Sequence, residues 1–257
     1  MSGESGRTIV AGQGGVNSRI GVEGLKAQSG RAIARGPESA CRDDSDSDLA
    51  KWSPMTDLAI IVLAAGKGTR MKSNLPKVMH RAAGRSLLGH VLHAARELSP
   101  ARAVAVVGPD MDQVEAEARR VFPQVASARQ TERLGTAHAV AQAKTALEGF
   151  PGTVMVLYGD VPLISAASLR RLAVLADHGR MAVLGFEAAN PHGYGRLLCN
   201  DRGDVTGIRE ELDASAEERA IRLCNSGIIA INSRLLWELL PKIGNANAKG
   251  EYYLTDL

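Results

Sequence analysis

Residues 58–71 read LAIIVLAAGKGTRM, an apolar run followed directly by a glycine-rich loop. A strand that is apolar on both faces is typical of the centre of a parallel sheet, because helices cover both sides of such a sheet. AVAVV at 103–107 and VMVL at 154–157 have the same character. The intervening segments with helical spacing of apolar residues are 87–98, 111–121 and 135–147. This alternation predicts an α/β fold with a mostly parallel central sheet and helices on both faces.

The alternation of apolar strands with helical segments ends after Met181, where short apolar segments follow one another closely. Such spacing is typical of mixed or antiparallel strand pairing. The predicted strands are 181–188, 196–199, 205–209 and 223–231, and a helix is predicted at 233–240.

The composition of the 257 residues is that of a globular chain, with 45% hydrophobic and 23% charged residues. A net charge of only +3 and an aromatic content of 4% argue against a nucleic-acid partner. The longest apolar run, residues 58–65, is far shorter than the roughly 20 residues of a membrane span, so no membrane partner is expected. Cys41, Cys199 and Cys224 are too widely spaced for a zinc motif, and their odd number favours the reducing cytoplasm.

Residues 1–57 differ in kind from the rest of the chain. They hold nine of the 27 glycines, a single aromatic residue and an acidic cluster at 43–48. We predict a disordered tail over 1–57 and a folded domain over 58–257. Met55 lies just before the first strand, which leads to the hypothesis that it is the natural start and that the tail is an upstream extension.

The glycine-rich loop that follows the first predicted strand is the strongest functional signal. Open α/β sheets bind ligands at the carboxyl ends of their strands, and Gly66 and Gly68 allow the backbone to approach a phosphate or base closely. Arg70 and Lys77 would add positive charge over the same anion. Neither the dinucleotide fingerprint nor the P-loop pattern fits, since Met71 stands at the third glycine position and no G-K-[ST] follows at the required distance. The alternative is an ordinary strand-to-helix turn.

A second signal is YGDVP at 158–162, at the end of the predicted strand VMVL. A carboxylate there would face the same crevice as the glycine loop, and carboxylate oxygens hold magnesium beside substrate phosphates. We therefore predict that Asp160 is a metal ligand. The alternative is a helix N-cap or turn aspartate, because Pro162 and Ser165 resemble the start of a helix.

Seven motifs follow one another along residues 58–257: LAAGKGTRM with LPK, Gln130 followed by LGTAHA, YGDVPL, GYGR, the glutamate of GIREELDA, CNSGI and GEYYLTD. In this order they resemble the uridylyltransferase domain of bacterial bifunctional N-acetylglucosamine-1-phosphate uridyltransferase/glucosamine-1-phosphate acetyltransferases, within the sugar-nucleotide pyrophosphorylase superfamily. The resemblance covers about 58–257. The resemblance implies a Rossmann-like nucleotidyltransferase fold with a mixed or antiparallel sugar-binding part.

The resemblance also implies roles for individual residues. It implies that the uridine nucleotide is held by Leu63, Ala64, Ala65 and Gly66 and that uracil is recognised by Gln130, Gly135 and Thr136. Tyr158 and Gly159 would flank the metal ligand Asp160, and Arg70 and Lys77 would contact the triphosphate. Gly195, Glu210 and Asn225 would contact N-acetylglucosamine. Read without the resemblance, Glu210 could equally be a solvated surface acid, Gly195 a turn and Asn225 a strand-end amide.

The implied reaction joins UTP and N-acetylglucosamine 1-phosphate to give UDP-N-acetylglucosamine and pyrophosphate, with Mg2+ as cofactor, for peptidoglycan and lipopolysaccharide precursors. Arg133 and Leu212 depart from the glutamine and lysine typical of the family. Family members continue past TDL with an asparagine that is a second magnesium ligand and with an acetyltransferase domain that forms a homotrimer, so we expect this chain to be a truncated domain. The alternatives are another sugar-1-phosphate nucleotidyltransferase and an inactive nucleotide-binding fragment.

Overall fold

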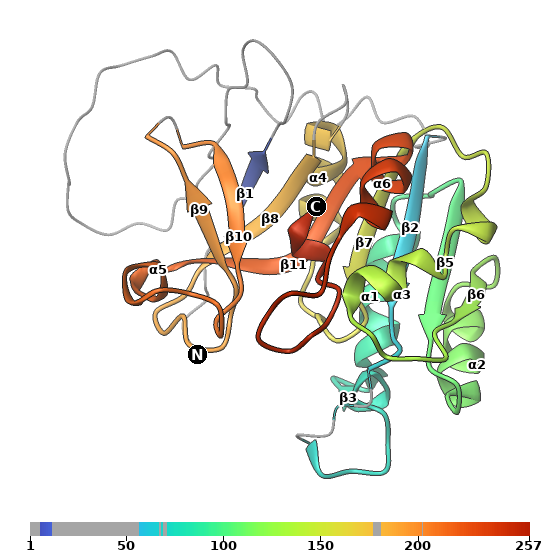
Figure 1. Ribbon diagram of the computed structural model, residues 1–257. Helices are drawn as coiled ribbons and strands as arrows, with labels where there is room; N and C mark the ends of the chain where they lie inside the picture. Colours follow the sequence, from blue (N-terminus) through green and yellow to red (C-terminus); the bar gives the residue numbers. More distant parts are fainter. Residues whose placement is uncertain (1–5, 12–56, 67, 69–70, 177–180, 202) are drawn as a thin grey trace, which may run out of the picture.

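The computed structural model of the chain describes residues 6–11, 57–66, 68, 71–176, 181–201 and 203–257. In this part of the chain, nine strands form one mixed sheet in which the main order is β1-β8-β11-β7-β2-β5-β6, with the β9–β10 hairpin attached to β11 (Figure 1). The strands of this sheet are β1 (Gly6–Ala11), β2 (Leu58–Leu63), β5 (Arg102–Val107), β6 (Ala126–Arg129), β7 (Thr153–Tyr158), β8 (Met181–Glu187), β9 (Arg196–Cys199), β10 (Val205–Arg209) and β11 (Leu223–Asn232). The short strands β3 (Arg81–Ala82) and β4 (Arg85–Ser86) pair separately.

The parallel half of the sheet contains β7, β2, β5 and β6, and it confirms the predicted fold class. In the register of β2 with β7, Leu63 lies opposite Tyr158, so these two strands end at the same edge. On the other side of β2, Leu63 pairs with Val106 of β5. The segments that follow β2 and β7 therefore leave the sheet side by side, which is where open α/β sheets bind ligands.

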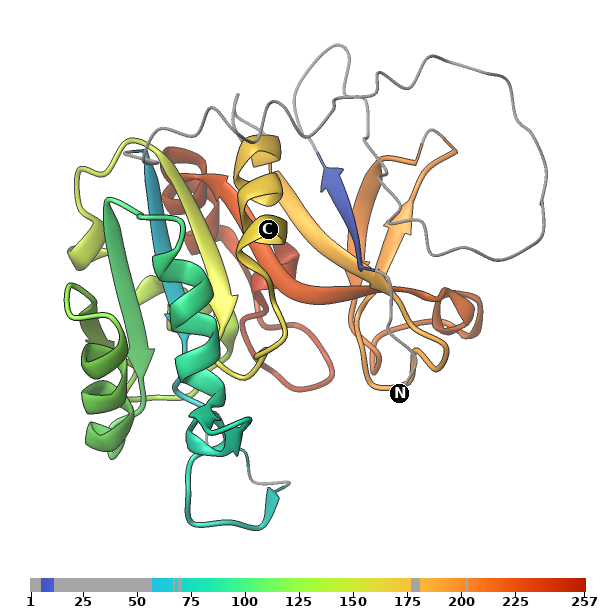
Figure 2. The ribbon, with the colours of Figure 1, turned by 180° about the vertical axis from the view of Figure 1, so that it is seen from behind.

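Helices cover both faces of the sheet, and alternate residues of β2 enter two separate cores. Leu58, Ile60 and Val62 pack with α1, α2 and α4. Ala59, Ile61 and Leu63 pack with α3 and α6 on the opposite face. The α3 and α6 face is in front in Figure 1, and the α1 and α4 face is in front in Figure 2. The α-helices are α1 (Leu87–Arg96), α2 (Asp112–Val121), α3 (Thr136–Ala141), α4 (Ala166–Ala176), α5 (Ala216–Ala220) and α6 (Ser233–Leu239).

The strand β11 connects the parallel half to an antiparallel half, as the sequence after Met181 predicts. Its last residues pair with β7, and its first residues pair with β8 and β9, all antiparallel. The register against β8 shifts between Asn225 and Ile229, and Gly227 within this irregularity has a φ of +84°. The shift sets Asn225 between the two halves of the sheet.

A helix and a strand of the parallel half differ from the sequence prediction. The segment 135–147, expected as one helix, forms α3 and then a separate 3₁₀ turn at Thr145–Leu147. Between them the backbone bonds Gln142 N to Ala139 O and Ala143 N to Val140 O run from i to i−3, which is 3₁₀ geometry. The strand β6, ASAR, has no apolar run and was not predicted, because it lies at the end of the main strand order.

Within the predicted tail, the structure describes residues 6–11 and Asp57. Residues 6–11 form a strand. This strand, β1, pairs antiparallel with β8, with Gly6 opposite Phe186 and Ala11 opposite Met181. Residues 12–56, with Met55, lie outside the described residues, so the division at 57/58 stays a prediction. Within the described ranges, no helix is both long and apolar enough to cross a membrane.

Candidate active site

A cavity of about 520 Å³ opens at the carboxyl edge of the parallel strands. It is lined by Leu63, Ala65, Gly66, Gly68, Met71, Lys77, Val78, Gln130, Arg133, Gly135, Thr136, Ala139, Tyr158, Asp160 and Glu251. Most residues that the sequence assigns to the nucleotide and the metal are in this set. Ala64 and Gly159 are buried beside it, and Arg70 lies outside the described residues.

Lys77 and Asp160 meet in this cavity although they are 83 positions apart in the sequence. The Lys77 ammonium donates to Asp160 Oδ2 at 2.6 Å. Lys77 begins the 3₁₀ helix η3 (Lys77–Met79), and Asp160 follows β7 by two residues. Both side chains keep contact with solvent, at 43% and 28% exposure, so a ligand can reach them.

The glycine loop is held by backbone contacts on both sides. Ala64 N donates to Val106 O at 2.8 Å, and Gly159 N donates to Leu63 O at 2.9 Å. Ala64 is 1% exposed and does not line the cavity, so the structure does not bring this predicted nucleotide contact to the surface of the site. Gly68 has a φ of +65°, and a Cβ there would lie 2.5 Å from Lys77 Cβ. Glycine at 68 therefore allows the loop to pack directly against the residue that carries the ammonium group.

Gln130 is a buried amide in the wall of the cavity. It is 4% exposed, and its Nε2 donates to Gly135 O at 3.1 Å and lies 3.1 Å from His138 Nδ1. Its backbone N donates to Val107 O at the end of β5. These contacts fix the amide next to Gly135 and Thr136, a combination of side-chain and backbone polar groups suited to the edge of a base.

Arg133 and Glu251 also line the cavity, and the sequence did not assign a site role to either of them. Arg133 Nε donates to Ala65 O at 2.9 Å, so this departure from the family motif contacts the glycine loop itself. Glu251 precedes Tyr252, whose N donates to Leu134 O and whose carbonyl accepts from Ala137 N. The only sequence signal for Glu251 is its place in the motif GEYYLTD.

The three residues assigned to the sugar form a second group at the antiparallel half of the sheet. Asn225 N donates to Gly195 O at 2.8 Å, and a Cβ built on Gly195 would lie 3.3 Å from Glu210 Oε1. Thr255 Oγ1 donates to the same Glu210 oxygen at 3.2 Å. The structure thus brings Gly195, Glu210 and Asn225 together, although they do not line the cavity described above.

Tyr158 lies between the two groups. Its hydroxyl bonds Thr136, which lines the cavity, and its ring would be 2.6 Å from a Cβ on Gly227, two residues after Asn225. Burial raises the pKa of Tyr158 to about 12. The phenol is therefore neutral and able to donate a hydrogen bond at any physiological pH.

Burial also raises the pKa of Glu210, and the negative charges of Asp256 and Asp213 act in the same direction. The hydrogen bond from Thr255 and the charge of Lys249 oppose this shift. Because the folded pKa lies above the unfolded value, the ionised carboxylate destabilises the fold. This penalty is absent at low pH, grows as pH rises between the two pKa values and is complete above the folded pKa.

Glu210→Gln is therefore expected to raise the melting temperature at pH 8, because it removes a half-buried charge while keeping an acceptor for Thr255. The difference from the unchanged chain should disappear at pH 4 and below. Differential scanning calorimetry of both proteins across this range measures it. A melting temperature that is lower at pH 8 in the variant would show that the carboxylate is stabilising.

The donor set around Asp160 fits a magnesium ion that is shared with substrate phosphates. Among the residues that the structure describes, no group of three or more His, Cys, Asp or Glu side chains could hold a metal alone. Magnesium is commonly bound by one or two carboxylates, with phosphate oxygens and waters as the other ligands. A part-exposed Asp160 carboxylate in a cavity of about 520 Å³, which has room for phosphates beside it, meets this requirement.

Comparison with known proteins identifies the family of the chain. Residues 60–241 match the model of the MobA-like NTP transferase domain. The chain is 52% identical over 206 residues to the Bifunctional protein GlmU of Rhodospirillum rubrum, covering 79% of this chain and 45% of that protein. It is 54% identical over 201 residues to the Bifunctional protein GlmU of Azorhizobium caulinodans, covering 77% of this chain and 44% of that protein. The chain thus spans less than half the length of these relatives.

Solved structures show the same fold at lower sequence similarity. A UDP-glucose pyrophosphorylase complexed with UDP-glucose superposes with a TM-score of 0.63 at 18% identity, covering 79% of this chain and 85% of that chain. The family match extends over most of the chain and includes both the parallel half and β11. This chain therefore belongs to the MobA-like NTP transferase domain family.

Proposed function

We propose that the chain joins UTP and N-acetylglucosamine 1-phosphate to form UDP-N-acetylglucosamine and pyrophosphate, with magnesium. The observation that carries this proposal is the meeting of Lys77 and Asp160 beside the glycine loop, in the cavity that also holds the buried amide of Gln130. The motif resemblance and the relatives named GlmU support the choice of nucleotide and sugar.

The chemistry requires positioning and positive charge rather than a protein base. A phosphate monoester has its second pKa near 6, so the sugar phosphate is already largely a dianion at neutral pH. One of its oxygens attacks the α-phosphorus of UTP in line, a new O–P bond forms, and the bond to the β-phosphate oxygen breaks. The leaving pyrophosphate carries away the electron pair, so negative charge grows on the leaving group. Cations at that position lower the barrier.

The residues of this chain that would act on the phosphates are Lys77, Arg70 and Asp160. Lys77 is positioned to exchange its partner Asp160 for a phosphate oxygen, because both groups face the same cavity. Asp160 would hold Mg2+, which supplies charge neutralisation to the phosphates when bound. Arg70, in the loop segment outside the described residues, is proposed as the second cation.

The sugar would be bound at the antiparallel half. Glu210 and Asn225 can accept from and donate to hydroxyl and acetamido groups, and Gly195 leaves space for the ring. Tyr158, whose hydroxyl bonds Thr136 and whose ring lies beside Gly227, would then lie between the sugar phosphate and the nucleotide. A reducing cytoplasm is proposed as the site of the reaction, because Cys41, Cys199 and Cys224 are odd in number and widely spaced in the sequence.

Release of pyrophosphate by the chain of 257 residues tests this proposal. We expect turnover with UTP, N-acetylglucosamine 1-phosphate and MgCl2, and loss of that turnover with EDTA. A panel of other nucleoside triphosphates and sugar 1-phosphates is the control. Preference for another pair would identify a different nucleotidyltransferase of the superfamily. Binding of UTP by calorimetry without any magnesium-dependent turnover would identify a non-catalytic nucleotide-binding module and contradict the proposal.

A further inference from the structure

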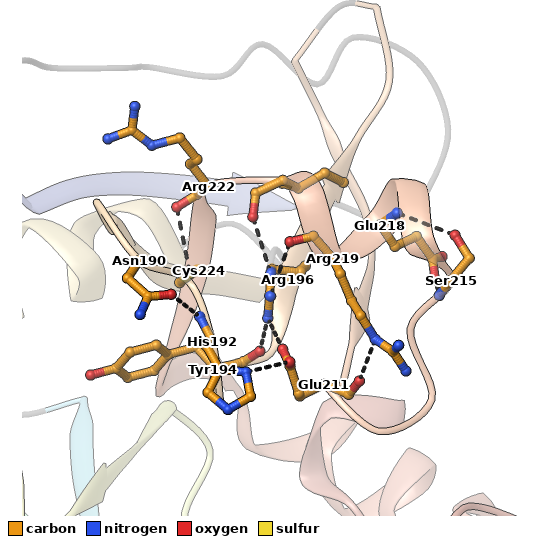
Figure 3. A network of polar contacts seen from close by, with 11 residues as sticks. Asn190, His192, Tyr194, Arg196, Glu211, Ser215, Glu218, Arg219, Arg222 and Cys224 are labelled. Carbon is orange, nitrogen blue, oxygen red and sulfur yellow. Dashed lines mark hydrogen bonds and ion pairs between the residues drawn. The ribbon is translucent and has the colours of Figure 1, made fainter.

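Arg196 is the largest fully buried side chain in the described part of the protein, at 1% exposure. Its Nε donates to Ile221 O at 3.0 Å and its Nη2 to Arg219 O at 3.1 Å, while Nη1 donates to Tyr194 O (Figure 3). Buried charges are found where they are paired and hydrogen-bonded, and here each guanidinium nitrogen has a protein acceptor. Arg196 thus ties the start of β9 to the carbonyls at the end of α5.

Glu211 supplies the counter-charge. Its Oε2 lies 2.6 Å from Arg196 Nη1, and its Oε1 lies 3.2 Å from His192 Nδ1 (Figure 3). The Arg196 guanidinium is the main cause that holds the pKa of the Glu211 carboxyl below its usual value, and a backbone bond from Gly193 adds to it. The carboxylate therefore joins the turn before β9, the strand β9 itself and the segment that follows β10.

Each partner of this ion pair is the direct neighbour of a residue assigned to the sugar. Gly195 precedes Arg196, and Glu210 precedes Glu211. The Glu210 carboxylate accepts from Thr255 Oγ1 and would lie 3.3 Å from a Cβ on Gly195, whereas the Glu211 carboxylate contacts Arg196. Glu210 and Glu211 thus make separate contacts, the first in the candidate sugar site and the second with the buried guanidinium that follows Gly195.

We infer that the Arg196–Glu211 ion pair positions Gly195 and Glu210 relative to each other and so determines the affinity for the sugar phosphate. This inference rests on the proposed function, since N-acetylglucosamine 1-phosphate is the ligand whose binding it controls. Two backbone bonds transmit the constraint: Asn225 N to Gly195 O at 2.8 Å, and Asp213 N to Glu210 O at 3.0 Å. Arg196 and Glu211 are positioning residues, with no contact to substrate required.

Glu211→Gln tests the inference, because it keeps the shape of the side chain and removes the charge. We expect the KM for N-acetylglucosamine 1-phosphate to rise by about tenfold or more, the cost of losing a charge-assisted contact. The KM for UTP should stay within about twofold, because the nucleotide cavity is built from other residues. Equal rises in both KM values, or no change in either, would overturn the inference.

Two further variants keep the test decisive. Glu211→Asp keeps the charge and moves it by one methylene group, so it is expected to fold and to raise the same KM by a smaller factor. Glu218→Gln is the matched control: this neighbouring carboxylate in α5 accepts from Ser215 N at 2.8 Å and Arg209 Nε at 3.3 Å and has no bond to Arg196. Both KM values should be unchanged in Glu218→Gln, and a sugar-specific rise there would contradict the assignment to Glu211.

Amide hydrogen exchange in the ligand-free protein separates this inference from the proposed function. In Glu211→Gln, the amides of Asn225 and Asp213 should exchange about tenfold faster or more, while the amide of Gln130, bonded to Val107 O, should not change. If the protein without substitution has no turnover, but these two amides exchange faster in Glu211→Gln, the proposed function fails and the positioning role stands. If the protein without substitution has turnover, but these two amides exchange at the same rate in Glu211→Gln, the positioning role is wrong.

Discussion

Asp160→Asn is expected to lower magnesium-dependent turnover by at least about a hundredfold, which corresponds to about 2.7 kcal/mol of lost transition-state stabilisation. The amide keeps the size of the side chain but loses the negative charge that would hold the metal beside the phosphates. It also releases Lys77, whose ammonium lies 2.6 Å from the carboxylate. Steady-state pyrophosphate release at saturating UTP and sugar phosphate measures the effect.

The folded state should tolerate this change. Partly exposed ion pairs contribute about 0–1 kcal/mol, and the two side chains are 43% and 28% exposed. Asp112→Asn is a matched control, because Asp112 forms a surface pair with Arg129 at 2.8 Å on α2 and does not line the cavity. Full turnover in Asp160→Asn, or an equal loss in Asp112→Asn, would contradict the role of Asp160.

The parallel part of the fold could be predicted from sequence because its strands are buried on both faces. The six residues of β2 are all buried, so the apolar run LAIIVL is itself the signal of a central strand. The same holds for most of β5 and β7. The strand β6 has only exposed and half-buried residues and therefore no such signal. An apolar run in the sequence therefore indicates that a strand is buried, and a strand without buried residues gives no such run.

Site residues could be predicted where a motif follows a strand, and not where a contact depends on packing. The glycine loop and Asp160 follow the ends of neighbouring strands, so topology brings them to one edge, and Lys77 reaches that edge by packing against Gly68 of the loop. Arg133 contacts Ala65 O across 68 positions, and nothing in its local sequence indicates this. Arg196 is a basic residue in a short strand, yet it is fully buried. Ile221 O, Arg219 O and the Glu211 carboxylate come from distant segments to meet its guanidinium, and Tyr194 O adds a local acceptor.

Gly135→Ala should be the most destabilising substitution in the nucleotide cavity. Gly135 has φ +120° and ψ 179°, a region in which side-chain-bearing residues are strained by about 1–3 kcal/mol. A Cβ there would also lie 2.4 Å from Tyr252 O and 2.7 Å from Tyr252 N. Overpacking of this kind costs about 1–3 kcal/mol more. We expect the melting temperature to fall by about 10 °C, since about 1 kcal/mol shifts a domain of this size by 2–4 °C.

Activity should fall along with stability, because the Tyr252 backbone and Gly135 hold the same wall of the cavity. Tyr252 N bonds Leu134 O, Ala137 N bonds Tyr252 O, and the buried amide of Gln130 bonds Gly135 O. Gly149→Ala is the control that distinguishes backbone strain from steric overlap. Gly149 has a φ of +68°, but a Cβ there meets no atom within 4 Å. This control should lose only the strain contribution, about 1–2 kcal/mol, and should keep its KM for UTP. Equal losses of stability in the two variants would mean that the backbone at Tyr252 moves aside at no cost. Tyr252 would then not hold Gly135 in place in the cavity wall.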